Sequence, residues 1–456
     1  MLRPARRSAT ADQRIAQALA DATDTRAVVV EAGALRSVDR VFAACFAGAP
    51  AIVVADETTW AVAGEATDGA LRAGGAEVRE AHVLPARPAP YADYGTVTAV
   101  ADALRGHDAI PVAVGSGTIN DIVKRAAHER DRPSMSVATA ASMDGYTAFG
   151  AAITKDGYKR TMTCPAPRAV VADLDVLTSA PPAMTASGYA DLLGKITAGA
   201  DWLVADALGV EPVREPAWSL VQPSLRAAVG RPADLRAGDR EALRALIDGL
   251  VTAGLAMQAD QSSRPASGAE HQFSHLWEME GLGHDTDPPL SHGFKVGLGT
   301  IAIAALYECL RATDLDRAVT DAAGRAWPGP GDAERAVRAL HPDPRLAGAA
   351  VAETLAKHPT ADERAARLDR LRGAWPQLRD RLDEQLLPAG DLRAMLDAAG
   401  CPTTPEEIGL SPDELRATYT RARTIRRRYT VLDLMHETGL LEPCADALFA
   451  PGGFWS

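Results

Sequence analysis

Two histidines lie four residues apart in the segment SGAEHQFSHLWEME, and a third histidine opens the segment SHGFKVGLG. On a helix, His271 and His275 would face the same side one turn apart, which is a spacing that metal ligands use. His292 follows, and with His284 between them four of the ten histidines lie within 22 residues. Glu270 precedes the first histidine, so the HExxH pattern of zinc proteases is absent. The spacing predicts a metal site, and the alternative is a set of histidines satisfied within a helical core.

A carboxylate is available upstream, in the segment ASGYADLLGK. Asp191 and Lys195 lie four residues apart in an otherwise apolar pattern, which a salt bridge along a helix explains. A metal-binding carboxylate beside a cation is the functional alternative. One carboxylate with two or three imidazoles suits Zn²⁺, Ni²⁺, Co²⁺ or Fe²⁺ better than Mg²⁺ or Ca²⁺.

The segment GSGTINDIVK follows an apolar strand pattern and opens a helical one. Glycines at such a turn let backbone N–H groups approach a phosphate at the helix N-terminus. Only a GxG pattern is present, with Asn120 at the position of the third glycine, so a plain tight turn is the alternative. Asp56 ends another strand pattern and could bond a ribose hydroxyl or cap a helix. In TAASMDGY, small hydroxyl-bearing residues could line a cofactor, although Asp144-Gly145 is also an ordinary turn dipeptide.

Strand and helix patterns alternate in the first third of the chain. Continuous apolar strands between helices indicate a parallel sheet that is covered on both faces. From about residue 181 only helical patterns appear, including the capped starts TPEEIG and SPDELRATYTRAR. We therefore expect an α/β domain over residues 1–178 and an all-helical domain over residues 179–456. The strands are expected at residues 27–33, 51–57, 110–117, 134–140 and 168–177.

The composition is that of an ordinary folded protein, with 47% hydrophobic and 24% charged residues among 456. A net charge of −12 argues against nucleic acid or an anionic membrane as the main partner. No apolar run reaches the roughly 18–20 residues of a membrane span. The start, MLRPARRSATADQR, lacks the apolar core of a signal peptide, and we expect it to be disordered. These features predict a cytoplasmic protein.

The five cysteines include no CxxC pair, so the sequence predicts no disulfide framework. Cys164 is expected to be a buried structural thiol. The chain has only six lysines against 42 arginines, and five of those lysines lie between Lys124 and Lys295 with the motifs above. Because an ammonium group does not replace a guanidinium at a tight site, Lys124, Lys195 and Lys295 are of interest beside the motif residues. Solvated surface lysines are the alternative.

Taken in order and spacing, the segments GSGTINDIVK, VATAASMDGYTAFGAAI, CPAPRAVVADLDVL, ASGYADLLGKITAGADW, SGAEHQFSHLWEME and SHGFKVGLGT resemble the sn-glycerol-1-phosphate dehydrogenases, most closely the bacterial AraM-like branch. That family belongs to the superfamily of iron-containing alcohol dehydrogenases and dehydroquinate synthases. The resemblance covers residues 110–300 and returns at 425–441, while residues 1–100 and 310–400 match only in general character.

The resemblance implies an NAD(P)-binding α/β domain and a helical metal-binding domain, as in dehydroquinate synthase. It implies Asp191, His271 and His292 as ligands of one divalent metal, with zinc favoured and nickel or iron as alternatives. His275 and Asp144 would face the substrate, with Asp144 beside the nicotinamide. Position 148 is Ala where the resemblance leads us to expect a hydroxyl-bearing residue near the cofactor. NAD(H) or NADP(H) would be held by the predicted cofactor residues, which are Asp56, Gly115, Ser116, Gly117, Thr118, Ile119, Thr139 and Ser142.

The implied reaction is the reversible reduction of dihydroxyacetone phosphate to sn-glycerol 1-phosphate, with His275 relaying a proton because its ordinary pKa is near neutrality. Asp191, Lys195 and Lys295 would also contact the substrate. Its phosphate could bind Lys195, Lys295, Lys159 or the cluster Arg426–Arg428. The alternatives are a reductase of another phosphorylated or phosphonate-bearing ketone or aldehyde, a cyclase like dehydroquinate synthase, or a metal-binding protein without activity. Beyond this small phosphorylated substrate we expect no nucleic-acid partner and no membrane span, and we expect a homodimer.

Overall fold

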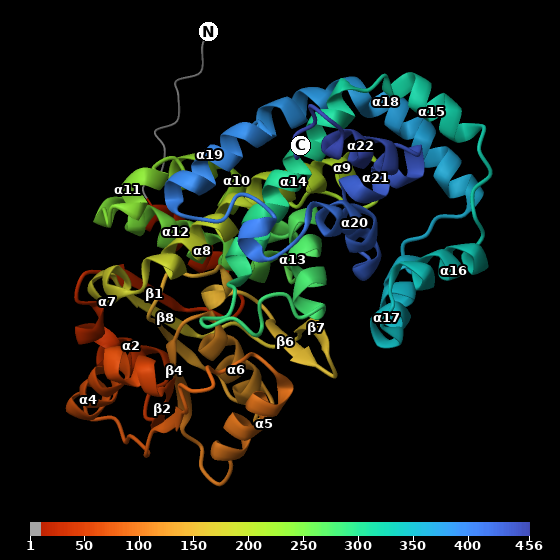
Figure 1. Ribbon diagram of the computed structural model, residues 1–456. Coiled ribbons are helices and arrows are strands. Elements are labelled where there is room, and N and C mark those ends of the chain that lie inside the picture. The colour runs from red at the N-terminus through yellow and green to blue at the C-terminus, as the bar shows by residue number, and fades with distance from the viewer. Residues whose placement is uncertain (1–10) are drawn as a thin grey trace. The chain divides into compact units, whose positions relative to one another are not determined.

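The computed structural model describes residues 11–456, and its chain divides into two compact units (Figure 1). The first unit comprises residues 11–155, 160–188 and 216–263, and the second comprises residues 156–159, 189–215 and 264–456. Most of the segment expected to be a disordered start, residues 1–10, lies outside the described residues. Residues 11–14 belong to helix α1 (Ala11–Asp21).

A parallel sheet of six strands, in the order β1-β8-β5-β4-β2-β3, forms the centre of the first unit. Five of the strands match the expected segments, because apolar runs between helices are the pattern of a sheet buried on both faces. The sixth, β3, is a three-residue edge strand whose length leaves little pattern to read. The strands are β1 (Ala27–Glu31), β2 (Ala51–Asp56), β3 (His82–Leu84), β4 (Ile110–Gly115), β5 (Met135–Ala138) and β8 (Ala169–Asp173).

Alternate residues of the strands pack against helices on opposite faces of the sheet. Val53 faces the side covered by α2 (Val38–Cys45) and α4 (Glu65–Ala73), where Phe42 and Leu71 are buried. Ile52 and Val54 face the side covered by α5 (Tyr94–Ala103) and α6 (Gly117–His128). This alternation of period two explains why β2 is apolar throughout. The expected doubly covered parallel sheet is confirmed.

A two-stranded hairpin, β6 (Ala151–Lys155) and β7 (Tyr158–Met162), was not expected from the sequence. Asp156 and Gly157 have φ values of 56° and 76° and form its turn. An Asp-Gly dipeptide with positive φ at both positions is the signature of a two-residue hairpin, so the sequence did carry this signal.

The single domain boundary expected at residue 178 is wrong, because part of the helical region packs with the sheet. In α12 (Arg240–Asp260), the carbonyl oxygen of Val251 accepts a hydrogen bond from the Thr147 hydroxyl at 2.7 Å. The Gln258 side chain accepts from the backbone N–H of Thr25 at 3.3 Å and donates to the Thr147 carbonyl oxygen at 2.6 Å. Buried polar contacts between segments more than 100 residues apart cannot be read from local patterns. The first unit also contains α7 (Leu174–Ser179), α10 (Glu215–Ala228) from Pro216 onward, and α11 (Pro232–Arg236).

The second unit is helical apart from the short segment 156–159. The segment 184–209 has the sequence pattern of a single helix, but the structure divides it between two. They are α8 (Pro182–Leu193), whose last turn belongs to this unit, and α9 (Lys195–Ala207), with Gly194 between them. The expected helix at TPEEIG is wrong, since only a 3-10 turn, Glu406–Ile408, forms before Gly409 with φ at 82°. The other helices are α13 (Ala269–Met279), α14 (His292–Ala312), α15 (Leu315–Ala323), α16 (Pro330–Leu340), α17 (Pro344–Leu355), α18 (Ala361–Gln385), α19 (Ala389–Ala399), α20 (Pro412–Ala422), α21 (Val431–Thr438) and α22 (Leu441–Phe449).

Two helices are long and apolar enough to cross a membrane by length and composition, contrary to the expectation that no such run exists. They are α12 and α14, and 78% and 83% of their most apolar windows are buried inside the protein. Burial of that extent is typical of core helices in a folded protein.

The expectation that the cysteines form no disulfide is wrong for one pair. Cys309 on α14 is bonded to Cys444 on α22, with the two Cα atoms 6.0 Å apart. The pair is separated by 135 residues and carries no local signature. Cys164 is buried as expected, and burial raises the pKa of its thiol to about 11.

Candidate metal centre and dinucleotide-binding turn

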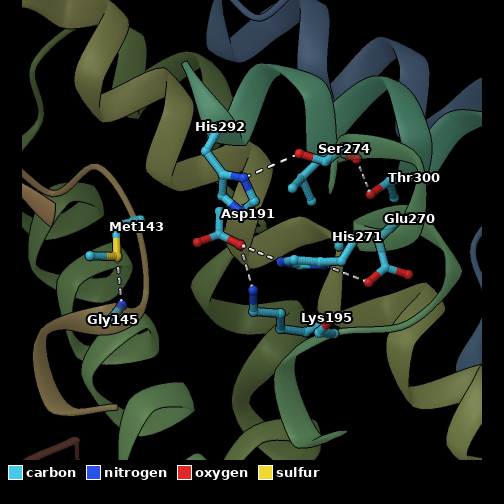
Figure 2. A network of polar contacts seen from close by, with 12 residues as sticks. Met143, Gly145, Asp191, Lys195, Glu270, His271, Ser274, His292 and Thr300 are labelled. Atoms are coloured by element: carbon cyan, nitrogen blue, oxygen red, sulfur yellow. Dashed lines mark hydrogen bonds and ion pairs between the residues drawn. The ribbon is translucent and has the colours of Figure 1, made fainter. Parts of the chain in front are cut away.

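Three helices of the second unit bring the expected metal ligands together. Asp191 lies in the last turn of α8, His271 in the first turn of α13, and His292 is the first residue of α14 (Figure 2). One potential ligand atom from each of the three lies within 4.8 Å of the others. Ser291 caps α14 by accepting a hydrogen bond from the Phe294 N–H at 3.3 Å, which fixes where that helix begins. The grouping predicted from the sequence therefore exists within one unit.

Small residues let these helices approach closely. A Cβ atom on Gly299 of α14 would lie 2.7 Å from the carbonyl oxygen of Glu270 on α13, which is a backbone atom that cannot rotate away. A Cβ atom on Gly194 would lie 2.9 Å from the Val296 side chain. The segments around Asp191, His271 and His292 are thus held at short backbone separations.

Asp191 is held as a carboxylate. Its Oδ1 atom lies 2.6 Å from the Lys195 Nζ atom and 3.4 Å from the His271 Nε2 atom, and Asp191 and Lys195 are almost completely buried. Burial would raise the pKa of Asp191, but Lys195 and His271 lower it well below its ordinary value. The sequence allowed either a salt bridge with Lys195 or a metal-binding role for Asp191. The structure shows the salt bridge, and the position of the carboxylate also suits a metal ligand. An ionised oxygen in a buried group of imidazoles is the form that binds a metal.

Each imidazole of the group has a carboxylate behind it. The His271 Nδ1 atom lies 2.8 Å from Glu270 Oε1 (Figure 2). The His292 Nδ1 atom lies 2.9 Å from Glu278 Oε1. Ser274 Oγ is also 3.1 Å from His292 Nδ1. A carboxylate on one ring nitrogen fixes the tautomer and leaves the other nitrogen as a metal donor. His271 and His292 would therefore offer Nε2.

A second buried carboxylate, that of Asp201, binds the first turn of α13 next to Glu270. Asp201 on α9 accepts hydrogen bonds from the Tyr307 hydroxyl at 2.7 Å, the Val431 N–H at 2.8 Å and the Ala269 N–H at 2.7 Å. Burial and the nearby charge of Glu270 raise the pKa of Asp201 to about 7. Asp201 thus ties α9, α14 and α21 to the first turn of α13.

His275 lies beside the metal group on the same face of α13. Its ring centroid is 6.0 Å from that of His271 and 5.8 Å from that of His292. Its Nδ1 atom lies 2.9 Å from an Arg426 nitrogen, and because arginine only donates, Nδ1 must accept. Burial and the Arg426 charge hold the pKa of His275 well below its ordinary value. The neutral ring therefore carries its proton on Nε2.

His275, Glu278 and His292 form a second possible metal group, with one potential ligand atom from each within 4.8 Å of the others. In this group His275 has no ring nitrogen left for a metal, because its Nδ1 accepts from Arg426 and its Nε2 carries the proton. The donor set around Asp191 has both histidine Nε2 atoms available and an ionised oxygen, so it is the better fit for a divalent metal.

In the first unit, the GSG turn joins β4 to α6 as expected. Ser116 occupies the N-cap position of α6, but its side chain forms no capping hydrogen bond. The first-turn N–H groups of Gly117, Thr118 and Ile119 therefore have no partner within the helix and suit a phosphate. A Cβ atom on Gly117 would lie 2.3 Å from the Met143 side chain, so any larger residue there would require Met143 to move.

The loop after β5 carries Thr139, Ser142 and Asp144. The Thr139 N–H donates to the Gly115 carbonyl oxygen at 3.1 Å, which places this loop beside the GSG turn. Asn120 donates to the Gly145 carbonyl oxygen at 3.0 Å, and Lys124 does so at 3.1 Å. These two residues of α6 therefore hold the Asp144-Gly145 turn, and the buried Lys124 has a structural role.

Asp56 caps α3 (Glu57–Thr59) and forms a capping box with Thr59. Its Oδ1 atom accepts from the Thr59 N–H at 2.9 Å, and the Thr59 hydroxyl oxygen accepts from the Asp56 N–H at 3.1 Å. The helix-capping alternative is thus realised. Contact of Asp56 with a ribose stays a prediction.

The chain is similar to known proteins in both sequence and fold. A family model described as iron-containing alcohol dehydrogenase matches residues 29–181. A glycerol-1-phosphate dehydrogenase [NAD(P)+] from Bacillus velezensis is 32% identical over 86% of this chain and 86% of its own length. The enzyme of that name from Bacillus subtilis is 34% identical over 73% of this chain and 71% of its own. The chain belongs to the glycerol-1-phosphate dehydrogenase family.

A solved structure of glycerol dehydrogenase from Schizosaccharomyces pombe has the same fold as this family member. The TM-score is 0.58 over 93% of this chain and 90% of that chain, at 14% identity. The expected fold class, a parallel α/β sheet region with a helical C-terminal portion, is confirmed, as is the resemblance stated from the motifs.

Several residues around the site were not expected from the sequence. Glu278 and Asp201 lie in apolar or mixed helix patterns, and only their burial, at 5% and 0% exposure, marks them as unusual. Arg426 was noted only as part of an arginine run. Glu270 was noted only for its order relative to His271. Its contact with the His271 ring could not be predicted from spacing, since adjacent residues of a helix do not usually face each other.

Proposed function

We propose that this family member is a metal-dependent oxidoreductase that reduces dihydroxyacetone phosphate to sn-glycerol 1-phosphate, reversibly, with NADH or NADPH. The observation that carries the proposal is the buried grouping of Asp191, His271 and His292, with both imidazoles oriented by carboxylates. Relatives that cover most of the chain bear the name glycerol-1-phosphate dehydrogenase [NAD(P)+].

Asp191, His271 and His292 are the residues that would hold the metal. A divalent zinc, nickel or iron ion bound there would act as a Lewis acid, polarising a carbonyl and stabilising negative charge on its oxygen. Lys195 keeps Asp191 ionised and in place through its contact at 2.6 Å. Glu270 and Glu278 keep both histidines in the tautomer that presents Nε2.

His275 is the proposed hydrogen-bond donor to the substrate oxygen. The expectation that it works through a pKa near neutrality does not fit its burial beside Arg426, which lowers the pKa. The same contact supports the role in another way. Because Arg426 donates to Nδ1, the Nε2–H group is fixed as a donor, and no titration near pH 7 is required.

The dinucleotide would bind in the first unit. The N–H groups of residues 117–119 would receive its phosphates, and Ser116 lies at the same turn. Thr139, Ser142 and Asp144 lie on the neighbouring loop, where Asp144 is proposed to contact the substrate beside the nicotinamide. We also propose a homodimer in the cytoplasm, with no partner other than the small phosphorylated substrate and the dinucleotide.

The test is oxidation of NADH or NADPH by full-length protein loaded with zinc, nickel or iron, with dihydroxyacetone phosphate as acceptor. Metal-dependent oxidation is expected. Asp191→Ala and His271→Ala should reduce it by at least about a hundredfold, since a lost metal ligand removes both the ion and its transition-state stabilisation. His358→Ala is the matched control, because His358 stacks on Trp327 and belongs to neither metal group.

A chiral assay of the product distinguishes sn-glycerol 1-phosphate from its enantiomer. Bound metal and bound dinucleotide without any oxidation would reject dihydroxyacetone phosphate as the substrate. Other phosphorylated or phosphonate-bearing carbonyl compounds would then be screened.

A further inference from the structure

The lysines and arginines that could bind the substrate's phosphate group differ in the partners that they already contact. Lys195 is fully buried and its Nζ atom lies 2.6 Å from Asp191, so its charge is used at the metal carboxylate. Lys195 was expected to contact the substrate, but its contacts assign it to the metal group.

Two of the three neighbouring arginines are directed elsewhere. Arg427 is 71% exposed and pairs with Glu353 at 2.8 Å. Arg428 is directed to the backbone, where it donates to the Ser267 carbonyl oxygen at 2.6 Å. Both side chains are therefore engaged by groups other than the histidines of α13.

Two of the remaining three cations, Arg426 and Lys159, contact His275 and Glu278. Arg426 donates to His275 Nδ1 at 2.9 Å and to the Lys159 carbonyl oxygen at 3.4 Å. Lys159 Nζ lies 3.0 Å from Glu278 Oε2, with 15% of the Lys159 side chain exposed. These contacts place both cations next to the imidazole that is proposed to face the substrate.

Lys295 adds a buried charge to the same group. It is only 2% exposed, and its Nζ atom donates to the Leu290 carbonyl oxygen at 3.3 Å. It lies close enough to Glu278 and Lys159 for both of their charges to act on its pKa. A buried ammonium group beside a second cation is electrostatically unfavourable unless anions offset both charges.

The charges of the group leave a positive surplus. Glu278 contributes one negative charge, and its other oxygen, Oε1, is directed at His292. Three positive charges and one negative charge leave a surplus of two, which matches the charge of a phosphate dianion. The phosphate oxygens accept charge-assisted hydrogen bonds from both lysine ammonium groups and the planar guanidinium of arginine.

We infer that Lys159, Lys295 and Arg426 form the binding site for the substrate's phosphate group. The identity of the substrate rests on the proposed function, whereas the anion site rests on the grouping of these side chains. Because Arg426 would contact both the phosphate and His275, it would align the reacting carbon with the Nε2–H donor.

The test compares neutral substitutions within the group with matched neighbours outside it. Lys159→Met and Lys295→Met remove one charge each, and Arg160→Met and Arg427→Met remove charges from the adjacent exposed arginines. Inorganic phosphate binding is measured by calorimetry on metal-loaded full-length protein. The Michaelis constant is measured for dihydroxyacetone phosphate and for dihydroxyacetone, which lacks the phosphate.

Each lysine substitution within the group is expected to weaken phosphate binding and to raise the Michaelis constant for dihydroxyacetone phosphate by about ten- to a hundredfold. The Michaelis constant for dihydroxyacetone should change much less than that for dihydroxyacetone phosphate, because dihydroxyacetone has no phosphate group to bind the site. Lys159→Arg should restore most of the phosphate affinity by restoring the charge. The two control substitutions should stay within about twofold of the parent protein.

Unchanged phosphate binding in both Lys159→Met and Lys295→Met, or no phosphate binding by the parent protein, overturns the inference even if the reductase activity is present. Phosphate binding that depends on these lysines, in a protein that does not reduce dihydroxyacetone phosphate, supports the anion site and rejects the proposed substrate instead.

Discussion

At the scale of single residues, the site depends on carboxylates that contact the Nδ1 atoms of His271 and His292. Glu270 accepts at one oxygen from both the Gly268 N–H, at 2.6 Å, and the His271 ring, at 2.8 Å. Its other oxygen accepts from the Thr197 hydroxyl at 3.0 Å. Burial would raise the pKa of Glu270, but His271 lowers it below its ordinary value. A fixed negative charge at this position makes the imidazole a stronger and better-oriented donor.

Glu270→Gln is therefore expected to weaken metal binding by about ten- to a hundredfold. The amide keeps the size of the side chain but removes the charge behind His271. Metal affinity is measured by competition with a chromogenic chelator. Glu280→Gln, at the other end of α13, is the matched control, because Glu280 pairs with Arg421 and should leave affinity unchanged. Equal affinities of the two variants would show that Glu270 has no role in orienting His271.

Lys295 gives the anion site a dependence on pH. Burial and the charge of Lys159 lower its pKa to about 8, while the charge of Glu278 opposes them. His284 also lies within reach of the Lys295 charge. Below pH 8 the ammonium form predominates and can bind an anion, and above it the charge is lost.

Phosphate affinity of the parent protein is expected to fall as pH rises through about 8, and this fall should be absent in Lys295→Met. The lower pH limit of the comparison lies slightly above neutrality, where inorganic phosphate is already mostly a dianion. The upper limit lies above the pKa of Lys295. Calorimetric titrations between these limits check the prediction. Parallel pH profiles for the two proteins would assign the dependence to another group.

The sequence predicted the residues of the metal group but not their partners. Asp191, His271 and His292 were reached from spacing, ligand type and motif resemblance, and the structure brings them within 4.8 Å. Glu278, Asp201 and Arg426 come from separate helices and a turn, and their roles depend on which side chains meet across the fold. Spacing along one helix carries no such information, so these residues were not predicted.

At the scale of secondary-structure elements, the site depends on how closely α13 and α14 pack. Gly299 faces the Glu270 backbone, and a Cβ atom there would lie 2.7 Å from a carbonyl oxygen. Since the oxygen belongs to a helix backbone, an added methyl group must push the two helices apart. His271 and His292 lie on those two helices and would separate with them.

Gly299→Ala is expected to lower the free energy of unfolding by about 1–3 kcal/mol and to weaken metal binding. Gly348→Ala is the matched control, because Gly348 lies within α17 with no atom near its Cβ position. That substitution should raise the free energy of unfolding by about 0.4–1 kcal/mol, since alanine favours a helix and restricts the unfolded chain. Both values come from urea titrations of the metal-free protein. Two substitutions of the same sign would contradict the close-contact argument.

Elements with a strong local pattern were predicted well. The five apolar strands and the long helices α12, α14 and α20 lie where the sequence indicates, because periodic burial and capping residues act locally. The break between α8 and α9 was missed, since the apolar pattern continues through Gly194 and only the approach of Val296 explains a glycine there.

At the scale of the whole molecule, the chain does not divide at one point. The first unit takes in residues 216–263 after the chain has already entered the second. Segments this far apart in sequence are joined by buried contacts such as that between Thr25 and Gln258, at 2.7 Å. The strand patterns stop at only one place in the sequence, so they predict a single domain boundary. The interleaved arrangement of the two units was therefore not predicted.

The disulfide closes a loop that spans most of the helical unit. Cys309 lies on the helix that begins with His292, and Cys444 lies on the last helix of the chain. A cross-link over 135 residues restricts the unfolded chain strongly, and typical disulfides contribute about 2–4 kcal/mol to stability. The oxidised chain should therefore hold α14 and α22 together more firmly than the reduced chain.

Thiol titration of the denatured, unreduced protein is expected to find three free cysteines, Cys45, Cys164 and Cys401, of the five in the chain. After reduction the count should rise to five, and the free energy of unfolding should fall. Cys309→Ser together with Cys444→Ser should reproduce that fall and abolish the effect of reductant. Cys401→Ser is the control, since its buried thiol has no disulfide partner and its response to reductant should match that of the parent. Five reactive thiols in protein purified without reductant would show that the pair stays reduced, and its stabilising effect would then be limited to packing between the two helices.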